Sequence, residues 1–421
     1  MNFFRDLHYD AKLLMASRGI RAFAFSYLNI VFAIYLDRLG YSTMTVGVIF
    51  SVAFISSAFV TAVWGYLSDR IGRKKILMLL ALLTIVSNVI LIYFTSLVFI
   101  LAAVIIASVG AGGSGAGGSG GGPFNPVEEA LLAEKCQPEN RNQIFAVNSC
   151  VGSVMGAFGA LASGLPQFLQ EERNWSAVES YKPLFILTIF FSVVLWFVYK
   201  SITEQHQPRS TERRISRSTG TFVTKMSLLA VVDNFGAGMA GSLVSYWFFL
   251  RFGVELKSLG VIFFASYIIA ALSFLSAPII ARRLGVVRTM AFSHGLASLI
   301  YLILPLAPTL APAAALLLIR SFFAYMDNPL RASFTMAMVK SSERGSAAGV
   351  TSLARVVPFG ISPTISTYLM QTVSLTLPIF IGGGLQLIND VAFFLMFRDI
   401  RPPEELGKEP FKVQGSKFNV S

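Results

Sequence analysis

The sequence predicts an all-α membrane protein in which twelve transmembrane helices form two similar six-helix halves. Of the 421 residues, 54% are hydrophobic and only 13% are charged, whereas about a quarter of the residues of an average soluble protein are charged. Apolar runs of membrane-spanning length recur along the chain, and such a helix needs roughly 20 apolar residues. Related patterns in the two halves indicate that a helical unit is repeated.

The twelve apolar segments follow one another with short polar connections. A short segment, 1–16, mixes charged and apolar residues and is expected to lie in the cytoplasm, as are the polar, basic linker 201–224 and the tail 399–421. The spans expected in the N-terminal half (17–200) are 17–37, 44–67, 75–94, 97–133, 142–166 and 182–200. Those expected in the C-terminal half (225–398) are 225–250, 256–281, 287–306, 310–338, 345–371 and 374–398.

The charge of the chain sets its orientation. Lys and Arg outnumber Asp and Glu by 34 to 22, and most of them fall on one side of the expected topology. Short loops rich in Lys and Arg stay in the cytoplasm. Both termini are therefore expected in the cytoplasm and the chain in the plasma membrane, and the positive charge implies no nucleic-acid partner.

Neither catalysis nor a metal or cofactor is expected from the motifs. The three histidines, His8, His206 and His294, are widely scattered in the sequence. No Lys-Ser or Lys-Thr pair follows the glycine-rich stretch, as a phosphate-binding loop would require. The sequence therefore predicts that the protein is not an enzyme.

The two halves repeat with one shift in register. Residues 47–50 (Gly-Val-Ile-Phe) recur at 260–263, whereas Asn-Pro at 125–126 recurs at 328–329, so the N-terminal half carries ten more residues between these points. The duplicated glycine-rich stretch 110–122 accounts for the surplus. It is expected either to unwind span 4 toward a cavity, because exposed backbone is tolerated in a membrane only there, or to extend at the outer surface.

A charged turn joins the second and third spans. Gly65 and Gly72 lack a Cβ, so neighbouring backbones are expected to approach closely at each end of this turn, and Arg70 and Arg73 mark it as cytoplasmic. The pattern Gly-x-x-x-Asp-Arg-x-Gly-Arg-Lys, with Asp69 as its acid, resembles the loop 2–3 signature of the major facilitator superfamily of secondary transporters.

This resemblance implies alternating access and a role for the acid of the turn. In the family, that acid pairs with an arginine of the loop between spans 4 and 5, here Arg141, and faces the start of span 11. By resemblance, Asp69, Arg70 and Arg73 would then form a latch that stabilises the outward-open state. The alternative is a basic loop that serves only to orient the chain.

Span 10 carries an ionisable stripe. Arg320, Asp327 and Arg331 lie at i, i+7 and i+11, which places them within about 20° of one another on a helix. Such groups avoid lipid, so they are expected to face a cavity or each other, either as a substrate or coupling site or as a structural ion pair. Glu128 replaces Arg331 in the other half, which suggests pairing across the two halves.

Further polar residues lie within other spans. Spans 1, 4, 7 and 10 line the central cavity in the family, so the resemblance favours Asp233 and Arg320 as site residues. Asp390 in span 12 is expected to be structural, and Arg21, one turn into span 1, is expected to snorkel to the inner interface. Other candidates for the substrate path are Asn29, Tyr325 and Arg355, followed by Tyr27, Tyr246 and Trp247.

The predicted function is secondary active transport of a small organic solute by a monomeric protein in the lipid bilayer. No ATP-binding motif is present, so coupling to protons is expected, with export as the first direction considered. The chain resembles the drug and metabolite permeases of the family, although glycines occupy the position of their span-4 arginine. The alternatives are uptake of an organic anion attracted by Arg320, a lipid flippase, or a non-transporting membrane sensor.

Overall fold

The structure is a computed structural model. It describes residues 8–107, 109, 122–135, 141–204, 217–326, 330–331, 334, 338–339 and 344–398, and this part of the chain is helical without a strand. The N-terminal half contains α1 (Tyr9–Arg38), α2 (Thr43–Ile71), α3 (Arg73–Tyr93), α4 (Leu97–Ala107), α5 (Phe124–Glu134), α6 (Arg141–Ala162), α7 (Leu165–Arg173) and α8 (Lys182–Ser201). The C-terminal half contains α9 (Arg217–Gly241), α10 (Val244–Phe252), α11 (Leu256–Leu284), α12 (Val286–Ile303), α13 (Leu310–Ala324), α15 (Arg344–Thr372) and α16 (Leu377–Phe397).

The described helices agree with the expected all-α membrane fold. Nine helical segments in this part of the chain are long and apolar enough to cross a bilayer, and α4 and α13 are shorter apolar helices. Helix α15 has 29 residues and contains Pro358 and Pro363. At 1.5 Å per residue, it too is long enough to span. The helix set is therefore consistent with twelve spans.

Two helices begin earlier in the sequence than the spans expected there. The segment 1–16 was expected to precede span 1, but α1 begins at Tyr9 and is continuous to Arg38. The side chain of His8 caps it by accepting from the backbone N–H of Asp10, at 3.2 Å. Similarly, α9 begins at Arg217, inside the expected linker.

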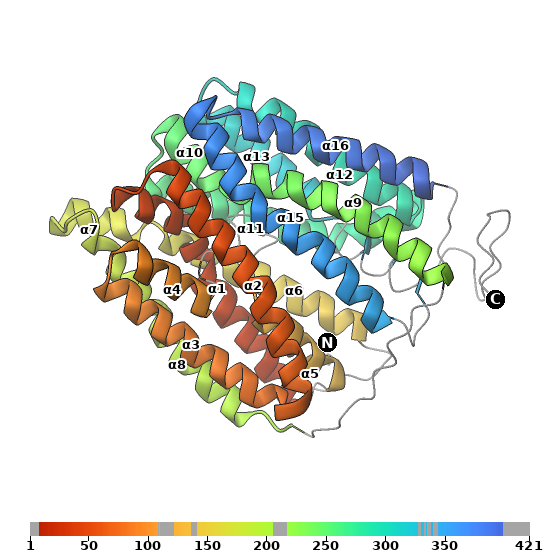
Figure 1. The fold of residues 1–421 in the computed structure, drawn as a ribbon, viewed down its shortest axis with the longest axis horizontal. Helices are drawn as coiled ribbons and strands as arrows, with labels where there is room; N and C mark the ends of the chain where they lie inside the picture. Colours follow the sequence, from red (N-terminus) through yellow and green to blue (C-terminus); the bar gives the residue numbers. More distant parts are fainter. Residues whose placement is uncertain are drawn as a thin grey trace.

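The two ends of the helix bundle differ in how the halves meet. We call the end where α2 passes into α3 the basic face, and the end where α1 passes into α2 the opposite face. Figure 1 shows α2 and α15 close together near α10 and farther apart at their other ends, near α5.

The buried apolar clusters follow the same division. One large cluster contains residues of both halves, among them Phe32, Phe50 and Trp247, and includes the parts of α1, α2 and α10 near the opposite face. The two other clusters each lie within one half, around Leu131 in the N-terminal half and around Phe334 in the C-terminal half. The halves thus share a core at the opposite face and have separate cores at the basic face.

Candidate functional site

A cavity of about 690 Å³ lies between the two halves. Residues of α2, α5, α9 and α15 line it, so both halves contribute. Most of the lining is apolar, and Ser57, Thr61, Asn125 and Asn234 add polar groups. Arg355, on α15, is the one charged residue among the described residues that line the cavity. A predominantly apolar cavity with a few polar groups is typical of a small-molecule site.

Close packing and hydrogen bonds join the halves at the opposite face. A Cβ at Gly47 of α2 would lie 1.8 Å from Thr367 Oγ1 and 2.7 Å from the carbonyl oxygen of Pro363 on α15, so only glycine permits this approach. Nearby, Thr364 Oγ1 and Ser51 Oγ are 2.7 Å apart and hydrogen-bonded. The cavity is therefore closed toward the opposite face.

Further polar contacts reinforce this closure. The hydroxyl of Tyr246 donates to the carboxylate of Asp37 at 2.7 Å. The backbone N–H of Met44 donates to Gln371 Oε1 at 2.9 Å. Both bonds connect residues of different halves, and both lie beyond the cavity, at the opposite face.

The charged turn between α2 and α3 is held by a carboxylate that the sequence did not single out. Gly72 has a φ of 109°, a conformation that favours glycine. The backbone N–H groups of Arg73 and Lys74 donate to the two oxygens of Glu204, at 2.6 and 3.0 Å. An anion at a helix N-terminus is stabilised by the free N–H groups and the helix dipole. Glu204 thus anchors the chain that follows α8 to the start of α3.

The two glycines of the turn differ in their surroundings. A Cβ at Gly72 would lie 3.0 Å from Glu204 Oε2, whereas a Cβ at Gly65 would meet no atom of the described residues within 4 Å. The described residues thus show the expected close approach at Gly72, and that at Gly65 stays a prediction. Arg70 is exposed, and the guanidinium of Arg73 forms an ion pair with Glu134.

The predicted latch lies outside the described side chains, because those of Asp69 and Arg141 are not among them. It remains a prediction that the Asp69→Asn variant transports at a fraction of the wild-type rate while it folds and inserts normally, because the amide carries no charge to pair with an arginine. Labelled-solute flux at matched protein amounts in the membrane would measure this. Unchanged flux would leave the turn with an orienting role only.

A buried ion pair joins α1 and α5 within the N-terminal half. Arg21, whose side chain is fully buried, pairs with Glu128, whose side chain is 6% exposed. Glu128 also accepts from Ser17 Oγ, at 2.8 Å, and from the hydroxyl of Tyr199. Arg21 donates further to Asn125 Oδ1, at 2.7 Å. The expectation that Arg21 snorkels to the interface is wrong, because its side chain is buried and its guanidinium binds Glu128 and Asn125.

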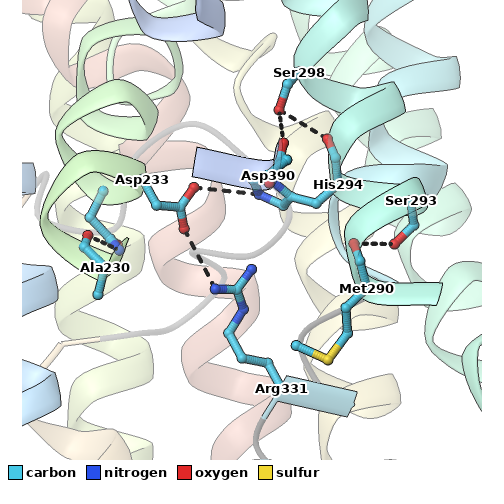
Figure 2. Close-up of polar contacts among 9 residues, drawn as sticks. Ala230, Asp233, Met290, Ser293, His294, Ser298, Arg331 and Asp390 are labelled. Atoms are coloured by element: carbon cyan, nitrogen blue, oxygen red, sulfur yellow. Dashed lines mark hydrogen bonds and ion pairs between the residues drawn. The ribbon is translucent and has the colours of Figure 1, made fainter. Parts of the chain in front are cut away.

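A second network of ionisable residues lies in the C-terminal half (Figure 2). Asp233 of α9 lies between Arg331 and His294: Arg331 Nη1 is 4.0 Å from Asp233 Oδ2, and His294 Nε2 is 3.8 Å from Asp233 Oδ1. The other ring nitrogen of His294, Nδ1, lies 2.7 Å from Asp390 Oδ1 of α16. Ser298 Oγ donates to Asp390 Oδ2 at 2.6 Å.

These two ion pairs are related by the internal repeat with their charges exchanged. Glu128 and Arg331 occupy equivalent positions of the two halves, and Arg21 and Asp233 are equivalent to within one residue. Each pair forms within its own half, Arg21 with Glu128 and Arg331 with Asp233. Glu128 and Arg331 thus each have a partner in their own half, and the suggested pairing across the halves stays a prediction.

The remaining predicted residues are dispersed. The guanidinium carbon of Arg320 lies 3.6 Å from the centre of the Tyr301 ring, and Tyr325 packs against Phe274. Asn29 is 1% exposed, and its amide atoms have no hydrogen-bond partner among the described residues. None of Arg320, Tyr325 and Asn29 belongs to the described cavity lining. Asp327 and the stretch 110–121 lie outside the described residues.

Sequence reasoning missed His294 as a site residue. It was set aside because no other histidine is near it in the sequence, and Asp390 was assigned a structural role. The sequence did contain a signal for His294, although not the spacing of the histidines. An ionisable residue inside an apolar span is itself an indication of function. His294, Asp233 and Asp390 all satisfy that criterion, and the structure brings them together.

Comparison with known proteins gives a consistent picture. The family model described as "Major Facilitator Superfamily" matches residues 14–360. A Saccharomyces cerevisiae protein named "Uncharacterized membrane protein YJR124C" is 22% identical, covering 92% of this chain and 94% of its own length. The multidrug resistance protein MdtG of Escherichia coli is 26% identical over 220 residues, about half of each chain (50% and 48%).

A solved structure shows the same fold. The crystal structure of the human organic anion transporter MFSD10 has a TM-score of 0.65 at 14% sequence identity, and the match covers 91% of this chain and 98% of that one. At this identity the likeness concerns the fold alone. The family match, the charged turn and the two helical halves all agree: the chain belongs to the major facilitator superfamily and is an integral multi-pass membrane protein of that transporter family.

Proposed function

We propose that this protein exports a small organic solute across the plasma membrane by alternating access and exchanges it for protons. The observation that carries the proposal is the cavity of about 690 Å³ between the halves, closed at the opposite face. With both termini in the cytoplasm, the basic face is the cytoplasmic one, so this conformation is poised to receive a solute from inside. The protein works as a monomer in the bilayer.

The individual parts of the proposal have separate support. The apolar lining with a few polar groups suits a solute that is largely apolar. A buried network that contains a histidine supports protons as the coupling ion, since histidine changes charge near physiological pH. The relative MdtG is named a multidrug resistance protein, which favours export over uptake.

The test is solute flux measured together with proton flux. Purified protein is reconstituted in liposomes that contain a pH-sensitive dye, and a panel of fluorescent organic cations, anions and neutral compounds is applied. A compound that moves and changes the internal pH in the opposite sense supports proton-coupled export. Movement without a pH change contradicts proton coupling, and binding without movement of any compound would favour a membrane sensor.

For the alternative function, uptake of an organic anion, the structure favours a different anion-binding residue from the one expected. Arg320 was expected to attract the anion, but it stacks on Tyr301 away from the described cavity lining. Arg355 lines the cavity instead, and the structural neighbour MFSD10 is titled an organic anion transporter. Uptake of an organic anion would therefore depend on Arg355.

A substitution at Arg355 separates the two candidates. Arg355→Gln is expected to weaken binding of anionic probes about tenfold or more, since a charged hydrogen bond contributes about 1.5–3 kcal/mol, and to change binding of neutral probes little. Equilibrium binding of the fluorescent panel would measure both. Equal effects on both probe classes would contradict a role of Arg355 in charge selection.

A further inference from the structure

We propose that His294 binds the transported proton, with Asp390 fixing its ring and Asp233 stabilising its charged form. This inference rests on the proton coupling in the proposed function and assigns that coupling to a site. The residues come from three helices of the C-terminal half, α9, α12 and α16, and Asp233 immediately precedes Asn234, which lines the cavity.

The geometry gives the two ring nitrogens of His294 different roles. Nδ1 lies 2.7 Å from Asp390 Oδ1, and an ionised carboxylate can only accept, so Nδ1 carries a hydrogen. Asp390 is 4% exposed, and its other oxygen accepts from Ser298 at 2.6 Å. Asp390 therefore fixes the orientation of the ring and leaves Nε2 as the atom that gains and loses a proton.

The second ring nitrogen faces a carboxylate at a distance that permits both protonation states. Nε2 is 3.8 Å from Asp233 Oδ1, and this oxygen accepts no hydrogen bond from the described residues. A protonated Nε2 is attracted to Asp233, and a small movement would convert the contact into a hydrogen-bonded ion pair. A neutral Nε2 presents a lone pair to the carboxylate, so Asp233 would then lean toward Arg331.

The formal charges of this chain of contacts sum to zero only when a proton is bound. Arg331, Asp233, His294 and Asp390 are linked by contacts of 4.0 Å or less. One guanidinium and two carboxylates leave one negative charge uncompensated when His294 is neutral, and an imidazolium cancels it. Binding of one proton to His294 would therefore neutralise these four residues, and uncompensated charge within a membrane protein is costly.

Two described residues near His294, Arg320 and Ser293, make contacts of their own. Arg320, on α13, stacks on Tyr301 at 3.6 Å, two helical turns beyond His294 on α12. Ser293, the neighbour of His294, donates to the backbone oxygen of Met290. Among the described residues that α9, α12, α13 and α16 present here, Asp233, Asp390 and Arg331 are thus the charged groups linked to the ring.

The equivalent pair in the other half needs no proton. Arg21 and Glu128 cancel each other, and Glu128 is also held by Ser17 and Tyr199. The ions of that pair are in direct contact, whereas Asp233 is 3.8 and 4.0 Å from its two cationic partners. The repeat thus contains one fixed pair and one adjustable pair, and the adjustable pair carries the histidine.

The proton cycle follows from these contacts. While the cavity faces the side of higher proton concentration, Nε2 takes a proton from water and the imidazolium attracts Asp233, which weakens the contact of Asp233 with Arg331. While the cavity faces the other side, solute binds beside Asn234 and Asp233 moves back from His294 toward Arg331. Nε2 then returns the proton to water. One proton is bound and one released in each cycle.

The direct test is a titration of His294 that needs no solute. The chain has three histidines, so His8→Gln with His206→Gln leaves His294 alone in a full-length protein labelled with nitrogen-15 histidine. NMR in lipid nanodiscs should show His294 titrating reversibly. In Asp233→Asn and in Asp390→Asn, the midpoint should move by about one to three pH units toward acid, because an opposite charge nearby is lost.

Controls make the titration decisive. Ser293→Ala, adjacent but outside the chain of contacts, should leave the midpoint unchanged. If Asp390→Asn does not fold, Asp233→Asn alone decides. A His294 resonance that does not titrate between about pH 4 and pH 10, or a midpoint that neither aspartate changes, overturns the proposal.

Transport separates this proposal from the proposed function. His294→Gln should abolish solute-driven proton flux and retain exchange of the compound that the wild type moves. Wild-type transport without proton flux contradicts the coupling itself. Coupled wild-type transport with an equally coupled His294→Gln variant overturns the site and leaves the proposed function standing.

Discussion

Glu128→Gln is expected to destabilise the folded protein by about 3–5 kcal/mol, the usual cost of removing one partner of a buried ion pair. Arg21 is fully buried, and glutamine cannot compensate its charge. The glutamine oxygen can still accept from Ser17 and Tyr199, which donate to Glu128 Oε1, but its amide NH2 would then face the guanidinium of Arg21. This is the largest stability effect of any single substitution considered for the chain.

Thermal unfolding of the purified protein in detergent would measure the effect, and two further variants interpret it. The double variant Arg21→Met with Glu128→Leu removes both charges and should recover most of the loss, since apolar replacements of a buried pair are often neutral or stabilising. Glu134→Gln, which breaks the more exposed pair with Arg73, should cost less than about 1 kcal/mol. A Glu128→Gln protein as stable as the wild type would contradict the buried pairing.

Gly47→Ala is expected to prevent closure at the opposite face and to reduce transport by tenfold or more. The added Cβ would lie 2.7 Å from the carbonyl oxygen of Pro363, and a backbone atom cannot move aside as a side chain can. Helices α2 and α15 would have to separate there. A penalty of about 1.4 kcal/mol against the closed state already changes its population ratio tenfold.

Spin labels on the loops at the opposite face, at Tyr41 and Ser374, would report the separation, after the native cysteines are replaced. The distance distribution should move to longer values in Gly47→Ala, with the protein still folded. Gly384→Ala is the matched control, because a Cβ there would meet no atom of the described residues within 4 Å. Unchanged distances in Gly47→Ala would show that α2 and α15 adjust without opening.

The sequence was sufficient for the fold and the family because both depend on local patterns. Apolar runs of membrane length and the charged turn at residues 65–75 can be read in a continuous stretch. The prediction that Arg21 snorkels to the inner interface was wrong because the start of the first helix was misplaced. Span 1 was expected to begin at residue 17, whereas α1 begins at Tyr9. Arg21 lies 12 positions after Tyr9, about 18 Å along the helix, and is buried among residues of α1 and α5 rather than at the end of α1.

The partners of the charged residues could not be read from one sequence. His294 and Asp390 are 96 positions apart and meet because α12 packs against α16. Arg21 and Glu128 are 107 positions apart. The packing of the helices within each half decides which ionisable residues contact one another. The sequence therefore predicted that the buried charges matter, and the structure was needed to pair them.

The apolar core that both halves share at the opposite face implies that the conformational equilibrium depends on temperature. Opening that face must expose part of the shared surface around Phe32, Phe50 and Trp247 to a water-filled vestibule. Exposure of apolar surface raises the heat capacity, and hydrophobic attraction weakens on cooling. In a colder membrane the contribution of this core to closure is therefore smaller, and the balance moves toward the conformation that is open at the opposite face.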